Sequence, residues 1–219
     1  MTGRSESSAN LGKRFEQHLF TMGSNVSPAV AQALWQNIAT HYNEPVRAYH
    51  NLAHLQQLFI QFEQVKNHLK QPHIIALAFF YHDVIYNPLR TDNELKSAEY
   101  AIKKLSPHLT AEQCQRIYQL IMMTADHQLD DARDSDGAFL LDMDLSILGT
   151  DWLEYKKYAQ AIRQEYAHVP LADYQAGRAK VLTGLRDRPR LYLTDYYYQR
   201  LEKQARENTK HEVNLLHAA

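Results

Sequence analysis

The chain has 219 residues, 45% of them hydrophobic, and its 24 basic and 25 acidic residues leave a formal net charge of -1. A chain of this size and apolar content can bury a sizeable core and fits one domain. The near-zero charge gives no overall attraction to nucleic acid polymers or to an anionic membrane surface, so neither is expected as a partner. An anionic substrate must therefore be held by local cations.

The sequence favours a cytoplasmic protein. Cys114 is the single cysteine and cannot form a disulfide within the chain, and residues 1–15 lack the apolar stretch of a signal peptide. The longest apolar run, residues 74–81, is far too short to span a bilayer. The sequence leaves open whether the protein forms homo-oligomers.

Helix-forming residues dominate the chain. Seven glycines and seven prolines interrupt stretches that are rich in Leu, Ala, Gln, Glu, Lys and Arg, which favours helix over strand. We therefore expect an all-α protein, with helix starts at Ser27-Pro28 and Pro72 and a break at Asn87-Pro88. In chain order, the predicted helices are 11–22, 27–42, 49 onward, 72–83, 92–105, 110–126, 138–148, 151–168, 170–186 and 194 onward.

Histidine and aspartate signals in three of these segments indicate a metal site. His50 and His54 in YHNLAH are four residues apart, so on a helix they share one face and could converge on one ion. His82 and Asp83 end an apolar helix and lie about 100° apart around it, so a wide cavity-facing surface could use both. Asp144 lies in an apolar stretch where an unpaired carboxylate is costly and should meet a cation.

Each signal also has an ordinary interpretation. With 12 histidines in the chain some must be surface or hydrogen-bonded residues, and Asp144 could cap the segment that follows it. Asp142 stands two residues earlier and is an alternative ligand. The joint occurrence of the signals nevertheless favours a helical bundle that holds a catalytic divalent metal.

The motifs YHNLAHLQQL, YHDVIYNP, DNELKSAEYA, LDMDLSILG and LEKQARENTKHE resemble the HD superfamily of metal-dependent phosphohydrolases, in particular its small predicted phosphohydrolases. The resemblance runs roughly from Arg47 to Glu212. YHNLAH and the DLS at Asp144 are also similar to cyclic-nucleotide phosphodiesterases. The resemblance implies a single HD-domain-like helical bundle over 1–219. Its parts would be a helical lead-in at 1–45, a metal-site core at 46–150 and C-terminal helices at 151–219.

The resemblance also implies roles for individual residues. It makes His50 the proton donor and His54, His82, Asp83 and Asp144 the metal ligands, with Asp83 also counted among the catalytic groups as a bridge to a second ion. Phosphodiesterases carry a further histidine where this chain has Tyr86, so a second metal is left open.

Further groups could complete such a site. His127 could be a second-metal ligand and Glu94 a catalytic carboxylate, although Glu94 also suits the first turn of a helix for its charge alone. Arg47, next to the first motif, and Arg178 are candidate phosphate clamps, since arginine binds phosphate in a bidentate manner.

We therefore expect hydrolysis of a small phosphate ester, a nucleotide or a related metabolite, by a metal-activated water. The mixed ligands suit manganese, iron, cobalt, nickel, zinc or magnesium, with one ion expected. Two alternatives remain: a di-iron oxygenase on the same scaffold, and a nucleotide-binding regulatory module without turnover.

Overall fold

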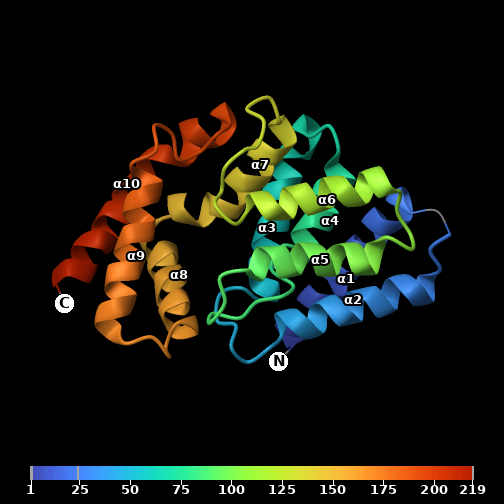
Figure 1. The fold of residues 1–219 in the computed structure, drawn as a ribbon, viewed down its shortest axis with the longest axis horizontal. Coiled ribbons are helices and arrows are strands. Elements are labelled where there is room, and N and C mark those ends of the chain that lie inside the picture. The colour runs from blue at the N-terminus through green and yellow to red at the C-terminus, as the bar shows by residue number, and fades with distance from the viewer. Residues whose placement is uncertain (1, 24, 219) are drawn as a thin grey trace. The chain divides into compact units, whose positions relative to one another are not determined.

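The computed structural model describes the backbone of residues 2–23 and 25–218, and the side chains of 10–23 and 25–218. This part of the chain is helical and has no strand, which confirms the all-α prediction (Figure 1). The helices are α1 (Thr2–Met22), α2 (Pro28–Tyr42), α3 (Leu52–Val65), α4 (Pro72–Tyr81), α5 (Asn93–Leu105), α6 (Ala111–Met123), α7 (Ser135–Asp144), α8 (Trp152–Glu165), α9 (Leu171–Arg186) and α10 (Asp195–Ala218), with 3-10 turns η1 (Lys66–His68) and η2 (Leu145–Gly149).

The chain divides into two compact units, Met1–Leu140 and Leu141–Ala219, where the sequence leads us to expect one domain over 1–219. The boundary falls inside α7 and inside the predicted metal-site core. We call the two parts the first and the second unit.

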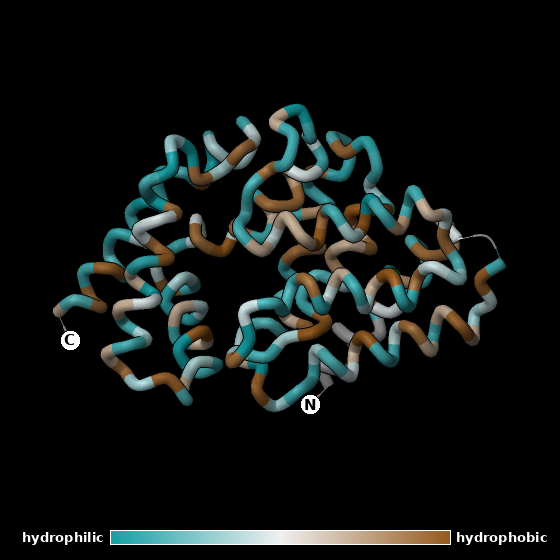
Figure 2. Tube along the Cα trace, viewed as in Figure 1, coloured by the Kyte–Doolittle hydropathy of each residue, from teal (hydrophilic) through white to brown (hydrophobic). Residues whose placement is uncertain are grey.

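Helix α4 is the core of the first unit. Every residue from Ile74 to Tyr81 is buried, as expected of a helix that is apolar all round. Helices α1, α3, α5 and α6 pack against it. Phe80 of α4 contacts Phe15 of α1 and Phe59 of α3, with ring centroids 5.2 and 4.6 Å apart. The surrounding helices carry both hydrophobic and hydrophilic residues along their length (Figure 2). This is typical of helices that bury one apolar face against a core.

Several helix starts follow the signals in the sequence. Ser27 accepts a hydrogen bond from the Val30 N–H at 3.3 Å, and Pro28 is the first residue of α2. Thr110 forms a capping box at the start of α6. The predicted helix starts at Ser27-Pro28 and at residue 110 are confirmed. The caps favour these starts because they satisfy N–H groups that have no partner within the helix. Helix α1 is longer than predicted and begins at Thr2.

Helix α3 differs from its prediction in a way that affects the site. It begins at Leu52, because Asn51 accepts a hydrogen bond from the Ala53 N–H at 2.8 Å and caps the helix. His50 therefore lies before the helix, and the prediction that His50 and His54 share one helical turn is wrong.

Helices α8, α9 and α10 form the second unit together with η2. Helix α10 packs along α9 and against η2 (Figure 1). Asp151 caps α8 by accepting from the N–H groups of Leu153 and Glu154 at 2.9 and 3.1 Å. The Asn208 side chain of α10 donates to the carbonyls of Leu148 and Thr150 at 2.9 and 2.8 Å. These bonds fix the segment after α7 to the last helix.

The close approach of η2 to α10 gives a testable prediction. A Cβ atom at Gly149 would lie 2.5 Å from Leu201 Cβ and 3.1 Å from the Leu201 carbonyl oxygen. Gly149→Ala is therefore expected to destabilise the protein by about 1–3 kcal/mol in urea unfolding. Gly184→Ala is the matched control, because a Cβ there meets nothing within 4 Å and should stabilise α9 by about 0.5–1 kcal/mol. Equal effects of the two substitutions would contradict this account.

Candidate metal centre

His82 is positioned by the end of α4. It is the residue after the helix, with helical dihedral angles, and it is 2% exposed. Its Nδ1 lies 2.8 Å from the Phe79 carbonyl oxygen. A carbonyl can only accept, so Nδ1 carries a proton and donates it. This bond fixes the orientation of the ring and leaves Nε2 as the nitrogen for a metal or for a second proton.

Two further donor atoms of the first unit lie beside His82 Nε2. His54, in the first turn of α3 and 5% exposed, places its Nε2 3.3 Å away. Asp83 Oδ2 lies 2.9 Å from His82 Nε2 and 3.7 Å from His54 Nε2. The structure thus brings together three of the predicted ligands.

The spacing of these three atoms fits a metal ion. A triangle with edges of 2.9, 3.3 and 3.7 Å has a centre about 1.9 Å from each corner, close to the roughly 2.0–2.2 Å of zinc–nitrogen and zinc–oxygen bonds. His54, His82 and Asp83 could therefore hold one divalent ion together. The same distances also fit a doubly protonated His82 paired with Asp83. The donor set of two imidazoles and one carboxylate favours the metal.

The electrostatics keep Asp83 ionised. Burial by itself raises the pKa of this carboxyl, but the neighbouring His82, His50 and His54, together with a hydrogen bond from His82, outweigh it and hold the pKa below its usual range. A carboxylate that is ionised at neutral pH is the form that a metal ligand requires.

Arg47 joins the two histidine motifs through their backbones. Its guanidinium donates to the carbonyls of His50, Asp83 and Val84 at 3.0, 2.7 and 3.0 Å. It lies against the rings of Tyr42 and Tyr86, 5.0 and 5.4 Å from their centroids.

These contacts give Arg47 a positioning role that the sequence does not predict. Its Nε donates to Glu44 at 3.1 Å, so four hydrogen bonds already engage the guanidinium. The residue is 7% exposed. The predicted role as a phosphate clamp stays a prediction.

His50 lies beside the three donor atoms. Its ring stacks on Tyr86, with centroids 4.4 Å apart and an angle of 30° between the planes, and its centroid is 6.0 Å from that of His54. Tyr49 contacts it edge-on at 5.0 Å. A half-buried imidazole next to possible ligands, with its orientation set by two tyrosines, is suitably placed to exchange a proton with a substrate.

The start of α5 is tied to the loop after Asp83. Ser97 Oγ accepts from the Ile85 N–H and donates to the Ile85 carbonyl, both at 3.1 Å. Asn93 makes two 3.0 Å bonds with the Asn87 backbone. Glu94 is half-buried in the first turn of this helix. It belongs to the segment that frames the motif, and its catalytic role stays a prediction.

His127 follows the end of α6. It is half-buried and has a left-handed backbone with φ of 51°, a conformation in which histidine is more frequent than most residues other than glycine. Its role as a second-metal ligand stays a prediction.

In the second unit, hydrogen bonds give Asp142 a structural role. Asp142 is 1% exposed and accepts from the Leu193 N–H at 2.7 Å and from the Thr194 N–H and hydroxyl at 2.7 and 2.6 Å. Both of its oxygens thus hold the segment that leads into α10. Asp144 is the half-buried last residue of α7, and its role as a metal ligand stays a prediction.

Arg178 is engaged within the second unit. Its Nε and Nη2 donate to the Glu212 carboxylate at 2.9 and 3.3 Å, and Nη1 donates to the Tyr158 hydroxyl at 3.2 Å. Its side chain is 10% exposed. A substrate phosphate would have to compete with Glu212 for this group, and the predicted clamp role stays a prediction.

No protein-family model, curated protein or solved structure matches the chain. Within the described residues, no helix combines the length and the apolar character that crossing a membrane requires.

Proposed function

We propose that the protein is a metal-dependent hydrolase of small phosphate esters, with nucleotides and related metabolites as the substrate class. The observation that carries this proposal is the triangle of His54 Nε2, His82 Nε2 and Asp83 Oδ2, with His50 beside it. The HD-like motifs support it independently. Asp144 is proposed as a further carboxylate ligand, since its donor type completes a set of two imidazoles and two carboxylates.

In this reaction, each residue of the site would have its own role. A divalent ion, when bound, would lower the pKa of a water molecule and offset negative charge on the phosphate. His82 is held in the tautomer that presents Nε2, and Asp83 supplies negative charge. His50, in its protonated form, would donate a proton to the oxygen of the leaving group. Arg47 holds the backbones of His50 and Asp83 in position by donating hydrogen bonds to both carbonyls.

The first experiment combines metal analysis with phosphate release. The purified protein is analysed for bound metal and then assayed on a panel of nucleotides and phosphate monoesters with manganese, iron, cobalt, nickel, zinc or magnesium added. We expect turnover that depends on the metal and is lost on chelation. Stoichiometric iron without phosphate release would contradict the proposal and favour the di-iron oxygenase. Absence of both bound metal and turnover would leave the nucleotide-binding module.

A matched pair of variants tests the role of Asp144. Asp144→Asn is expected to lower metal affinity by about 10–100-fold, because an amide is a weaker ligand than a carboxylate. Asp142→Asn is expected to retain metal affinity and to lower stability by about 1–3 kcal/mol, because its NH2 group would face one of the N–H donors at 193–194 in place of an acceptor oxygen. Titration calorimetry and urea unfolding measure the two effects. Loss of metal in Asp142→Asn alone would assign the ligand to Asp142.

A further inference from the structure

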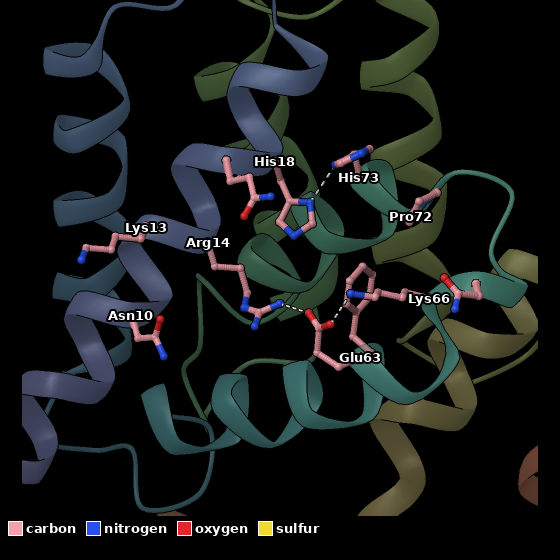
Figure 3. A pocket seen from close by; sticks show the side chains of 11 residues that line it. Asn10, Lys13, Arg14, His18, Glu63, Lys66, Pro72 and His73 are labelled. Carbon is pink, nitrogen blue, oxygen red and sulfur yellow. Dashed lines mark hydrogen bonds and ion pairs between the residues drawn. The ribbon is translucent and has the colours of Figure 1, made fainter.

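A cavity of about 390 Å³ lies in the first unit among residues outside the candidate metal centre. Side chains from α1, from the end of α3 with η1, and from the start of α4 line it (Figure 3). Its volume is within the range of pockets that take small metabolites. The residues that matter for its chemistry are Lys13, Arg14, His18, Glu63, Lys66 and His73.

The cavity carries more positive than negative charge. Lys13, Arg14 and Lys66 line it, and Glu63 is the one carboxylate among the lining residues. Arg14 and Lys66 both pair with Glu63, the lysine at 2.6 Å. These two cations lower the pKa of Glu63 despite its partial burial, which acts to raise it. One carboxylate cannot neutralise three cations, so the cavity should attract an anion and repel a metal ion.

Two histidines that can accept a proton, His18 and His73, line the same cavity. His18 is 6% exposed, and its Nδ1 lies 2.9 Å from His73 Nδ1. Only one proton can lie between two such nitrogens, so one ring donates and the other accepts. Burial, His73 and Arg14, with a smaller effect of Lys66, lower the pKa of His18 to about 4, against the opposing charge of Glu63.

The pair responds to charge in a defined direction. Besides His73, the groups that act on His18 are Arg14 of its own helix and Glu63 and Lys66 from the end of α3 and from η1. The rings of Phe59 and Phe62 cover its remaining sides, with centroids 6.2 and 5.6 Å away. An anion in the cavity would add negative charge and raise the proton affinity of the pair.

We propose that this cavity binds a small phosphate-bearing anion, with Lys13, Arg14 and Lys66 supplying the charge and the His18–His73 pair taking up a proton as the anion enters. None of these residues belongs to the candidate metal centre. The inference therefore does not depend on the proposed hydrolase activity. It gives the first unit a second ligand site, whose occupancy would respond to pH.

Sulfate is the probe that tests this proposal. It is a tetrahedral oxyanion like phosphate, but its charge stays constant between pH 6 and 8, so any pH dependence of binding comes from the protein. Binding to the full chain is measured by titration calorimetry with EDTA present. We expect saturable binding that is weaker at pH 8 than at pH 6, by up to about a hundredfold, because uptake of one proton changes the affinity by up to about tenfold per pH unit. Absence of saturable binding would overturn the proposal.

Variants locate the site. Lys13→Ala/Lys66→Ala should weaken sulfate binding about tenfold, as expected for the loss of two nearby charges. Lys70→Ala/Lys103→Ala, which removes two exposed lysines that do not line the cavity, should leave it unchanged. His18→Gln/His73→Gln, which removes both imidazoles of the pair, should remove the pH dependence while retaining binding. Equal weakening in both lysine double variants, or an unchanged pH profile in His18→Gln/His73→Gln, would overturn the proposal.

Discussion

His82→Gln is expected to abolish stoichiometric binding of a divalent metal, with a loss of affinity of at least about 100-fold. The imidazole is one corner of the donor triangle, and its Nδ1–H bond to the Phe79 carbonyl is what directs Nε2 at His54 and Asp83. A glutamine side chain cannot make that bond and present a ligand nitrogen at the same place. Titration calorimetry with manganese and zinc measures the affinity.

His108→Gln is the control, because it removes a partly exposed imidazole from the same unit outside the donor triangle. It should retain full metal affinity. The competing interpretation, a protonated His82 paired with Asp83, makes a different prediction. In that case the wild-type protein binds no metal, and His82→Gln only lowers the free energy of unfolding, by about 1–3 kcal/mol. Metal content and stability, measured on the same two variants, distinguish the interpretations.

Local signals in the sequence explain why part of this site could be predicted. His82 and Asp83 follow a run of eight buried apolar residues and precede the break at Asn87-Pro88. The placement of both side chains at the end of a core helix therefore follows from composition alone. The sequence pattern predicts a helix start near Tyr49, but Asn51 is a common cap residue and starts α3 at Leu52, which places His50 before the helix.

Other features depend on contacts that leave no local signal. Arg47 donates to carbonyl groups 36 and 37 residues away. Because every residue has a carbonyl group, the sequence does not indicate which ones Arg47 will bind. Asp142 and Asp144 look equivalent in LLDMDLS, and only the N–H groups of residues 193–194 distinguish them. The pairing of His18 with His73 likewise joins positions 55 apart. Tertiary packing decides each of these cases.

Arg47→Lys tests whether Arg47 positions the site or binds substrate. A lysine has one nitrogen, which cannot reach the carbonyls of His50, Asp83 and Val84 together. It also lacks the planar group that contacts the rings of Tyr42 and Tyr86. Because the side chain is buried, the lost bonds should cost about 2–4 kcal/mol in urea unfolding. Metal affinity should fall by about 10–100-fold, since the ligands are no longer held in place.

Arg90→Lys is the control, because Arg90 makes an exposed ion pair with Asp92, and neither stability nor metal affinity should change measurably. If Arg47 were instead a phosphate clamp, Arg47→Lys would retain stability and metal affinity and would raise only the KM for substrate. The two roles thus differ in measurements that need no knowledge of the substrate. The hydrogen bonds of Arg47 to the carbonyls of both motifs both stabilise the first unit and hold the metal ligands in position. Arg47→Lys should therefore lose metal affinity and stability together.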